Sequence, residues 1–164
     1  MQIETERLFL RSFKEADVDA YHRIVRDDRV TRHLGDGRPH SLDTARNYVL
    51  NCIRLENDSQ PTRFALVLKH THELVGFSGF KNLSGVLDFG YRVAVQHWGK
   101  GLATEAGDAI LAFGLGDLRL TNITARVVKG NAASIAVLRK LNFKDWDSAP
   151  IADPRLRWFR FDPN

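Results

Sequence analysis

The sequence predicts one α+β domain, built on a central and mostly antiparallel sheet that is flanked by helices. The chain has 164 residues and 43% of them are hydrophobic, which suits a single domain with a real core. Segments of period two and segments of helical period follow one another in the order β, α, α, βββ, α, β, α, β, β. Consecutive strands joined by short turns indicate an antiparallel meander. No linker interrupts the pattern, so residues 1–164 are expected to form one domain.

The first part of the chain is predicted to contain one strand and two helices. The strand is indicated by strict alternation, with Leu8 and Leu10 on one face. Ser12 precedes the first helix as a candidate N-cap, and Ser41 opens the second. The expected strand, helix, glycine-containing loop and second helix occupy residues 6–11, 14–27, 35–39 and 41–57.

The middle of the chain changes to period two after Pro61. A turn at residues 70–73 separates the first two strands of the meander. The three expected strands occupy residues 63–68, 74–80 and 86–95.

The last third is predicted to hold two helices and three strands. Leu102, Ala106, Ile110 and Phe113 form the apolar stripe of the first helix, which two glycines, Gly114 and Gly116, are expected to end. Asn131 is a good N-cap for the second helix, and Asn142 follows that helix where a left-handed residue is often required. The strands are expected at residues 121–128, 143–146 and 156–161.

Composition excludes several classes of protein. The formal charge of +4 and the pI near 9.5 suit an anionic ligand, but the cations form no run that would indicate nucleic-acid binding. No stretch approaches the ~18 apolar residues of a membrane span, and the N-terminus has no signal-peptide pattern. The single cysteine, Cys52, permits no internal disulfide, so a cytoplasmic location is the simplest expectation. His70 and His72 have no third ligand at metal spacing, and no metal site is expected.

The most informative segment is the glycine turn Gly99-Lys100-Gly101 between a strand and a helix. Glycine permits a positive φ and a close approach of ligand to backbone. The following helix N-terminus offers unpaired N–H groups and the positive end of its dipole. Small side chains at Ala103 and Thr104 keep the approach open. The turn therefore suits a phosphate or pyrophosphate, although a tight turn without a ligand would have the same pattern.

Two familiar nucleotide motifs do not fit this turn. A Walker A loop requires Ser or Thr after Gly-Lys, where this chain has Gly101. A dinucleotide fingerprint requires a third small residue, where this chain has Thr104, and too little chain follows for a large parallel sheet.

The sequence around the turn resembles the GNAT superfamily of N-acetyltransferases, in its RimJ/RimL-like branch. The segment Gln96–Gly101 matches that family's phosphate loop, Gln/Arg-x-x-Gly-x-Gly/Ala, at each defined position. The resemblance extends over nearly the whole chain in the right order, and its other motifs are the segments Thr5–Arg11, Asp88–Tyr91, Trp98–Ala106 and Asn131–Phe143. It implies a GNAT-like fold and acetyl-CoA as co-substrate.

The resemblance also implies how acetyl-CoA lies. Its pyrophosphate would rest on the main chain of the turn, and its pantetheine arm would run beside the strand that carries Val93 and Val95. The thioester would sit where this strand and the strand at 121–128 splay apart. The implied cofactor-binding residues are Val93, Val95, Gln96, Trp98, Gly99, Lys100, Gly101, Leu102, Ala103, Thr104 and Asn131.

Acetyl transfer to an amine needs a base, a polarised thioester carbonyl and a proton for the departing thiolate. Asp88 is the candidate base, acting through water, on the strand where the branch usually has Glu. Ser134 is the candidate proton donor, and Tyr91 is the alternative. The N–H of Val93 is the candidate that polarises the carbonyl. For Asp88 and Ser134, surface or packing roles remain open alternatives.

The expected function is direct transfer of an acetyl group to a primary amine within a ternary complex. The acceptor would be a protein N-terminus or a small molecule, reached through the segments Leu34–Thr44 and Asp145–Leu156. The absence of an acidic cluster disfavours polyamines. The alternative is a non-catalytic acyl-CoA-binding module on the same fold. By analogy with the branch, the chain is expected to be a monomer or homodimer.

Overall fold

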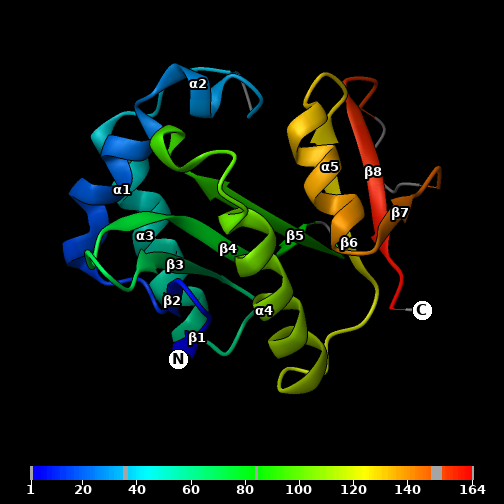
Figure 1. Cartoon of the computed structure of the whole chain (residues 1–164), viewed down its shortest axis with the longest axis horizontal. Helices are drawn as coiled ribbons and strands as arrows, with labels where there is room; N and C mark the ends of the chain where they lie inside the picture. Colours follow the sequence, from blue (N-terminus) through cyan, green and yellow to red (C-terminus); the bar gives the residue numbers. More distant parts are fainter. Residues whose placement is uncertain (1, 35–36, 84, 149–152, 164) are drawn as a thin grey trace.

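The computed structural model describes residues 2–34, 37–83, 85–148 and 153–163. These residues form one sheet in the order β1-β2-β3-β4-β5-β6-β8-β7, as Figure 1 shows. The strands are β1 (Gln2–Glu4), β2 (Leu8–Arg11), β3 (Arg63–Leu68), β4 (Leu74–Leu83), β5 (Val86–Val93), β6 (Ile123–Val128), β7 (Phe143–Asp145) and β8 (Leu156–Phe161). The helices are α1 (Val18–Val25), α2 (Asp28–Thr31), α3 (Leu42–Asn57), α4 (Leu102–Gly116) and α5 (Ala132–Lys140), with 3₁₀ turns η1 (Glu15–Asp17) and η2 (Val95–His97).

The predicted mostly antiparallel sheet is confirmed, and its one parallel junction lies at the centre. All neighbouring strands are antiparallel except β5 and β6. The β5–β6 register covers only two positions, Leu87 opposite Ile123 and Asp88 opposite Thr124. Both strands continue beyond this point, so the sheet opens between residues 89–93 and residues 125–128.

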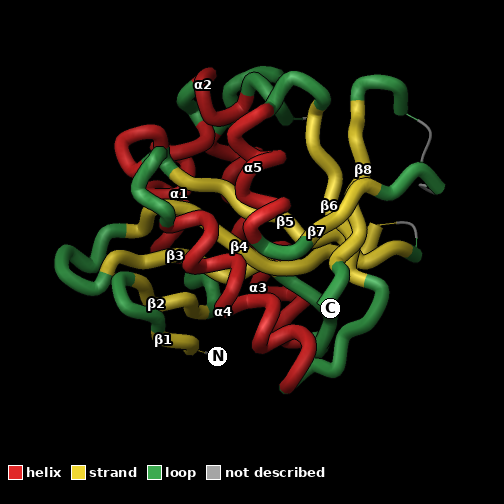
Figure 2. Tube along the Cα trace, turned by 45° about the vertical axis from the view of Figure 1, so that its right-hand side comes forward, coloured by secondary structure: helices red, strands yellow, loops and turns green. Residues whose placement is uncertain are grey.

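Helices cover both faces of the sheet, in three layers (Figures 1 and 2). Alternation along the strands sends neighbouring side chains to different cores: Leu66 packs with the α4 and α5 side, and Ala65 packs with the α1 and α3 side. Gly114 lies within α4 rather than ending it. Glycine is required here for packing, because a Cβ at this position would approach the Phe80 ring to 2.5 Å. Its missing side chain lets α4 pack closely against β4.

Several N-terminal predictions were wrong in detail. The expected cap Ser12 instead donates a hydrogen bond to Glu56, and the first helix begins later, through η1. Asp17 holds this turn by accepting from the Lys14 N–H at 2.8 Å and by pairing with Arg11 at 2.7 Å. The short elements β1 and α2 were not predicted, since neither is long enough to show a period.

Other local predictions are confirmed. The Ser41 side chain accepts from the Thr44 N–H and begins α3, and Asn142 has a left-handed φ of 62°. The observed β3 and β8 have the predicted bounds, whereas β4 continues three residues further and β6 begins two residues later than predicted. Residues 35–36 of the predicted loop and 149–152 of the predicted acceptor segment lie outside the described residues.

Two partly buried tyrosines predict a loss of stability at high pH. Burial raises the pKa of Tyr48 and of Tyr91 from 10.0 to about 12. Between these values the folded chain binds more protons than the unfolded chain. The contribution of the two tyrosines to the free energy of unfolding is therefore fully present below pH 10 and is lost as the pH rises toward 12. We expect the free energy of unfolding to fall by roughly 2–3 kcal/mol per tyrosine, measured by denaturant unfolding at neutral and alkaline pH. Tyr48→Phe should reduce this dependence; an unchanged slope would contradict it.

Candidate functional site

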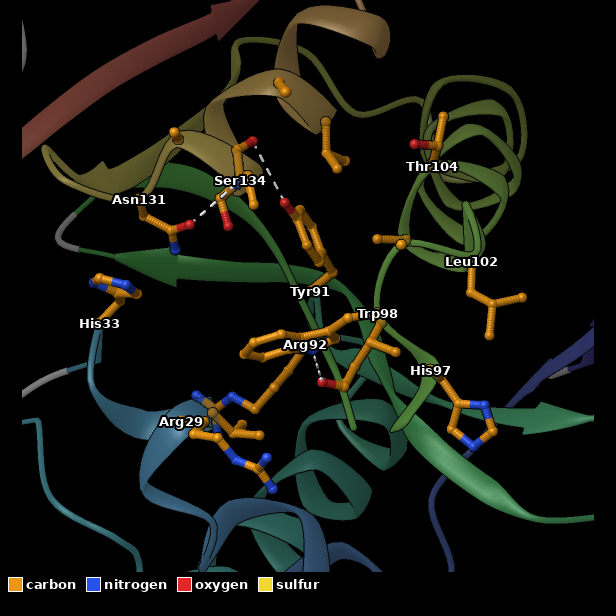
Figure 3. Close-up of a pocket in the computed structure, with 18 of the residues that line it drawn as sticks. Arg29, His33, Tyr91, Arg92, His97, Trp98, Leu102, Thr104, Asn131 and Ser134 are labelled. Atoms are coloured by element: carbon orange, nitrogen blue, oxygen red, sulfur yellow. Dashed lines mark hydrogen bonds between the residues drawn. The ribbon is translucent and has the colours of Figure 1, made fainter. Parts of the chain in front are cut away.

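A cavity of about 600 Å³ lies where the sheet opens. It is bordered by the end of β5, the first turns of α4 and α5, and α2 with the residues that follow it, as Figure 3 shows. The cavity therefore brings together four segments that are far apart in the sequence.

The glycine turn forms one wall of this cavity. The backbone leaves β5 at Val93, passes through η2 and reaches Gly99 and Gly101, whose φ angles are 73° and 78°. Gly101 is the N-cap residue of α4, so the helix begins with its free N–H groups beside the cavity. Glycine at both left-handed positions explains why the sequence has this spacing.

Two contacts from distant segments hold the turn. The Trp98 indole N–H donates to the Val93 carbonyl at 2.7 Å and ties the turn to the end of β5. Arg7 donates to the Lys100 carbonyl at 2.7 Å and pairs with Glu105 at 2.6 Å. No sequence pattern links Arg7 with Glu105, so their role in bracing the turn was not predicted.

The first turn of α5 forms the opposite wall. The Asn131 side chain caps the helix by accepting from the Ser134 N–H at 3.1 Å, as predicted. The Tyr91 hydroxyl donates to the Ser134 carbonyl at 3.4 Å, which joins β5 to α5 across the opening (Figure 3). Because burial raises the pKa of Tyr91 to about 12, the phenol stays protonated near neutral pH.

Most of the predicted site residues line the cavity. They are Tyr91, Val93, Trp98, Gly99, Gly101, Leu102, Ala103, Thr104, Asn131 and Ser134. Among the described lining residues, the other predicted members are absent. Val95 lies in η2 rather than on the strand and packs on the α1 and α3 side. The Gln96 side-chain amide donates to the Glu73 carboxylate. The Lys100 carbonyl accepts from Arg7.

Asp88 lies on the other face of β5 and is held by two guanidinium groups. It is 3% exposed, and its carboxylate lies 3.1 Å from Arg63 Nη2 and 3.6 Å from Arg126 Nε. Burial raises the pKa of Asp88 above its ordinary value, although both arginines oppose this shift. Its contacts are thus those of a buried ion-pair partner. The alternative that Asp88 is a surface carboxylate is wrong.

A row of basic side chains on the α2 side was not predicted as part of the site. Arg29, Arg32, His33 and Arg92 line this end of the cavity. The sequence gives no indication of this arrangement, because α2 is too short to show a period and Arg32 and His33 follow its end.

The cap at Asn131 gives a testable prediction. Asn131→Ala should lower the free energy of unfolding by about 1 kcal/mol, because the Ser134 N–H loses its acceptor. Asn131→Asp retains a cap and should retain most of this stability. Denaturant unfolding of the three proteins checks this; equal losses in both variants would show that the cap is not the stabilising contact.

Two surveys of the described residues are negative. No helix has the length and apolar character required to cross a membrane. No group of three or more His, Cys, Asp or Glu side chains is placed to hold a metal ion.

Comparisons with known proteins agree with this geometry. Residues 7–144 match the acetyltransferase (GNAT) domain. The chain is 32% identical over 143 residues to the uncharacterized N-acetyltransferase p20 of Bacillus licheniformis, covering 85% of this chain and 80% of p20. An acetyltransferase from Agrobacterium tumefaciens superposes with a TM-score of 0.87 at 25% identity, over 99% of this chain and 94% of that one. RimL, solved in complex with coenzyme A, shares the fold, with a TM-score of 0.81 at 18% identity over 98% of this chain and 97% of RimL. The chain therefore belongs to the GNAT family of N-acetyltransferases.

Proposed function

We propose that this enzyme transfers the acetyl group of acetyl-CoA directly to a primary amine within a ternary complex. The observation that carries the proposal is the left-handed glycine turn at the start of α4, beside the point where β5 and β6 separate. The turn supplies an anion site, and the opening supplies a place for a thioester between two strands.

The pyrophosphate is assigned to the N–H groups of residues 99–103, because the Trp98 N–H already donates to the Val95 carbonyl at 3.0 Å. The pantetheine arm is assigned to the free edge of β5. The Ala94 N–H donates to the Val75 carbonyl beside β4. In an antiparallel ladder, successive residues direct their backbone N–H and carbonyl groups alternately toward and away from the neighbouring strand. Val93 therefore directs its N–H and carbonyl away from β4 and toward the opening. Trp98 occupies that carbonyl, which leaves the Val93 N–H to polarise the thioester.

In the reaction, the amine nitrogen attacks the thioester carbonyl carbon. The new C–N bond forms, the C–S bond breaks, the nitrogen loses one proton and the sulfur gains one. We assign the proton donor to Ser134, whose hydroxyl is carried on the first turn of α5 beside the cavity. Tyr91 then acts as a positioning residue, because its hydroxyl holds the Ser134 carbonyl.

The base is assigned to solvent that relays the amine proton, with Asp88 as the carboxylate nearest the start of the opening. A direct proton transfer to Asp88 is disfavoured by its burial between Arg63 and Arg126.

The proposal is tested by measuring thiol release from acetyl-CoA against a panel of amino acids, small amines and N-terminal peptides. An amine-dependent release with intersecting initial-rate lines is expected for a ternary complex. Parallel lines would indicate a covalent acetyl-enzyme, and binding of acetyl-CoA without release on any amine would indicate a non-catalytic acyl-CoA-binding module.

A further inference from the structure

Three of the arginines that line the cavity, Arg29, Arg32 and Arg92, gather at its α2 end, whereas Lys140 lines it from α5. Residues from both faces of β5 line the cavity, so it passes from the glycine turn through the opening to α2. Among the described lining residues, every charged side chain is a cation and none is Asp or Glu. An amine acceptor that enters here would meet positive charge before it meets the thioester.

Arg92 is the cation placed closest to the opening. It projects from β5 on the face opposite Tyr91 and Val93, and Figure 3 shows its side chain extending toward Arg29 on α2. Its guanidinium lies 5.1 Å from the Phe77 ring centroid, and Nη1 donates to the Tyr21 hydroxyl at 3.0 Å. Its Nε is buried and has no hydrogen-bond partner among the described residues. Arg92 as a whole is only partly buried, and a guanidinium with an unused donor beside a cavity is a site for an acceptor oxygen.

The Arg29 guanidinium on α2 already pairs with Asp27 at 2.7 Å, but Arg92 has no such partner among the described residues. Arg63 also lies 5.1 Å from the Phe77 ring, so two guanidinium groups share one aromatic side chain. Their nearest carboxylate, Asp88, is already shared by Arg63 and Arg126. None of the ion pairs among the described residues joins Arg92 to an acidic side chain. The cluster therefore carries an excess of positive charge that an incoming anion would balance.

We propose that the amine acceptor carries a carboxylate, as a small amino-acid-like molecule does, and that Arg92 binds this group with help from Arg32. This inference rests on the proposed function, and it names the substrate class of that site. The planar guanidinium of Arg92 matches a carboxylate through two parallel N–H donors. With its carboxylate on the α2 side of β5, the acceptor extends its amine into the opening, toward the thioester assigned to Val93.

The test compares amino acids with their carboxamides, which have nearly the same shape but lack the charge of the group assigned to Arg92. Because the amide also has a less basic α-amine, the preference is read as the ratio of the two kcat/KM values in the wild-type enzyme against the same ratio in Arg92→Gln. The wild-type enzyme is expected to have a kcat/KM at least ~100-fold higher for the amino acid than for its amide, as expected for a buried charged contact. Arg92→Gln should remove this preference and leave the dissociation constant of acetyl-CoA unchanged. Arg92→Lys, which keeps the charge but loses the fork, should retain part of the preference.

Arg126→Gln is the matched control. It removes a guanidinium from the neighbouring strand that is not among the described cavity-lining residues, and it should keep the wild-type preference. A second comparison identifies the source of the carboxylate, by measuring kcat/KM for peptides that have Glu or Gln as their second residue. A higher value for the Glu peptide would support the proposal, with the carboxylate supplied by a peptide side chain.

Three outcomes separate the failures. If the wild-type enzyme acetylates amides as well as acids, this inference is wrong and the proposed function stands. If Arg92→Gln weakens acetyl-CoA binding while dephospho-CoA binding is unaffected, the cations serve the cofactor phosphate and the inference is overturned. If no amine is acetylated although the chain binds acetyl-CoA, the proposed function itself fails.

Discussion

Replacing Gly101 with valine is expected to weaken acetyl-CoA binding by about 100-fold. Gly101 has a φ of 78°, a conformation that a β-branched residue adopts only under strain. Valine would turn the backbone out of this conformation and rotate the N–H groups at the start of α4 away from the cavity. The strain of about 1–3 kcal/mol and the lost hydrogen bonds act together. Isothermal titration calorimetry with acetyl-CoA measures the effect.

Gly85→Val is the matched control for this variant. Gly85 has a similar φ of 84°, lies between β4 and β5 and is not among the described residues that line the cavity. The same strain should therefore lower stability without changing the affinity for acetyl-CoA. If Gly101→Val retained wild-type affinity, the pyrophosphate would not lie on this turn.

Replacing Ser134 with alanine is expected to lower kcat by about 100-fold, with little change in the KM for acetyl-CoA. Alanine keeps the backbone N–H that Asn131 accepts and keeps the carbonyl that Tyr91 contacts, so only the hydroxyl is lost. That hydroxyl is the group assigned to protonate the departing thiolate. Steady-state kinetics of thiol release provide the measurement.

Tyr91→Phe separates the proton donor from the positioning residue. It removes the hydroxyl that holds the Ser134 carbonyl at 3.4 Å, and kcat should fall by no more than about 10-fold. A larger loss in Tyr91→Phe than in Ser134→Ala would reverse the two roles.

The cofactor side of the site could be predicted because it depends on short, local patterns. The glycines at the start of α4 and the cap Asn131 each act on backbone atoms within a few residues of themselves. Period-two and helical patterns were also sufficient for the principal strands and helices. Val95, Gln96 and Lys100 are predicted cofactor residues that are absent from the described cavity lining. For Val95 the reason is local, because an apolar residue in η2 continues the strand alternation without continuing the strand.

The acceptor side could not be predicted because it depends on contacts between distant segments. Asp88 looked like a catalytic carboxylate, and only the fold shows that Arg63 and Arg126 surround it. Likewise, the sequence indicates only that Arg92 lies on the polar face of a strand. The fold is needed to show that its guanidinium contacts Tyr21 of α1 and Phe77 and lines the cavity together with α2. The sequence therefore indicates the half of the reaction that the family shares, whereas the half specific to this chain requires the tertiary structure.

Hydrogen–deuterium exchange with and without acetyl-CoA tests the central claim most directly, because the claim concerns backbone N–H groups. Acetyl-CoA is expected to slow exchange at the amides of residues 99–104 and at Val93, and to leave β1 and β7, at the two sheet edges, unchanged. If acetyl-CoA binds but protects other segments while residues 99–104 exchange as before, the glycine turn is not the cofactor site.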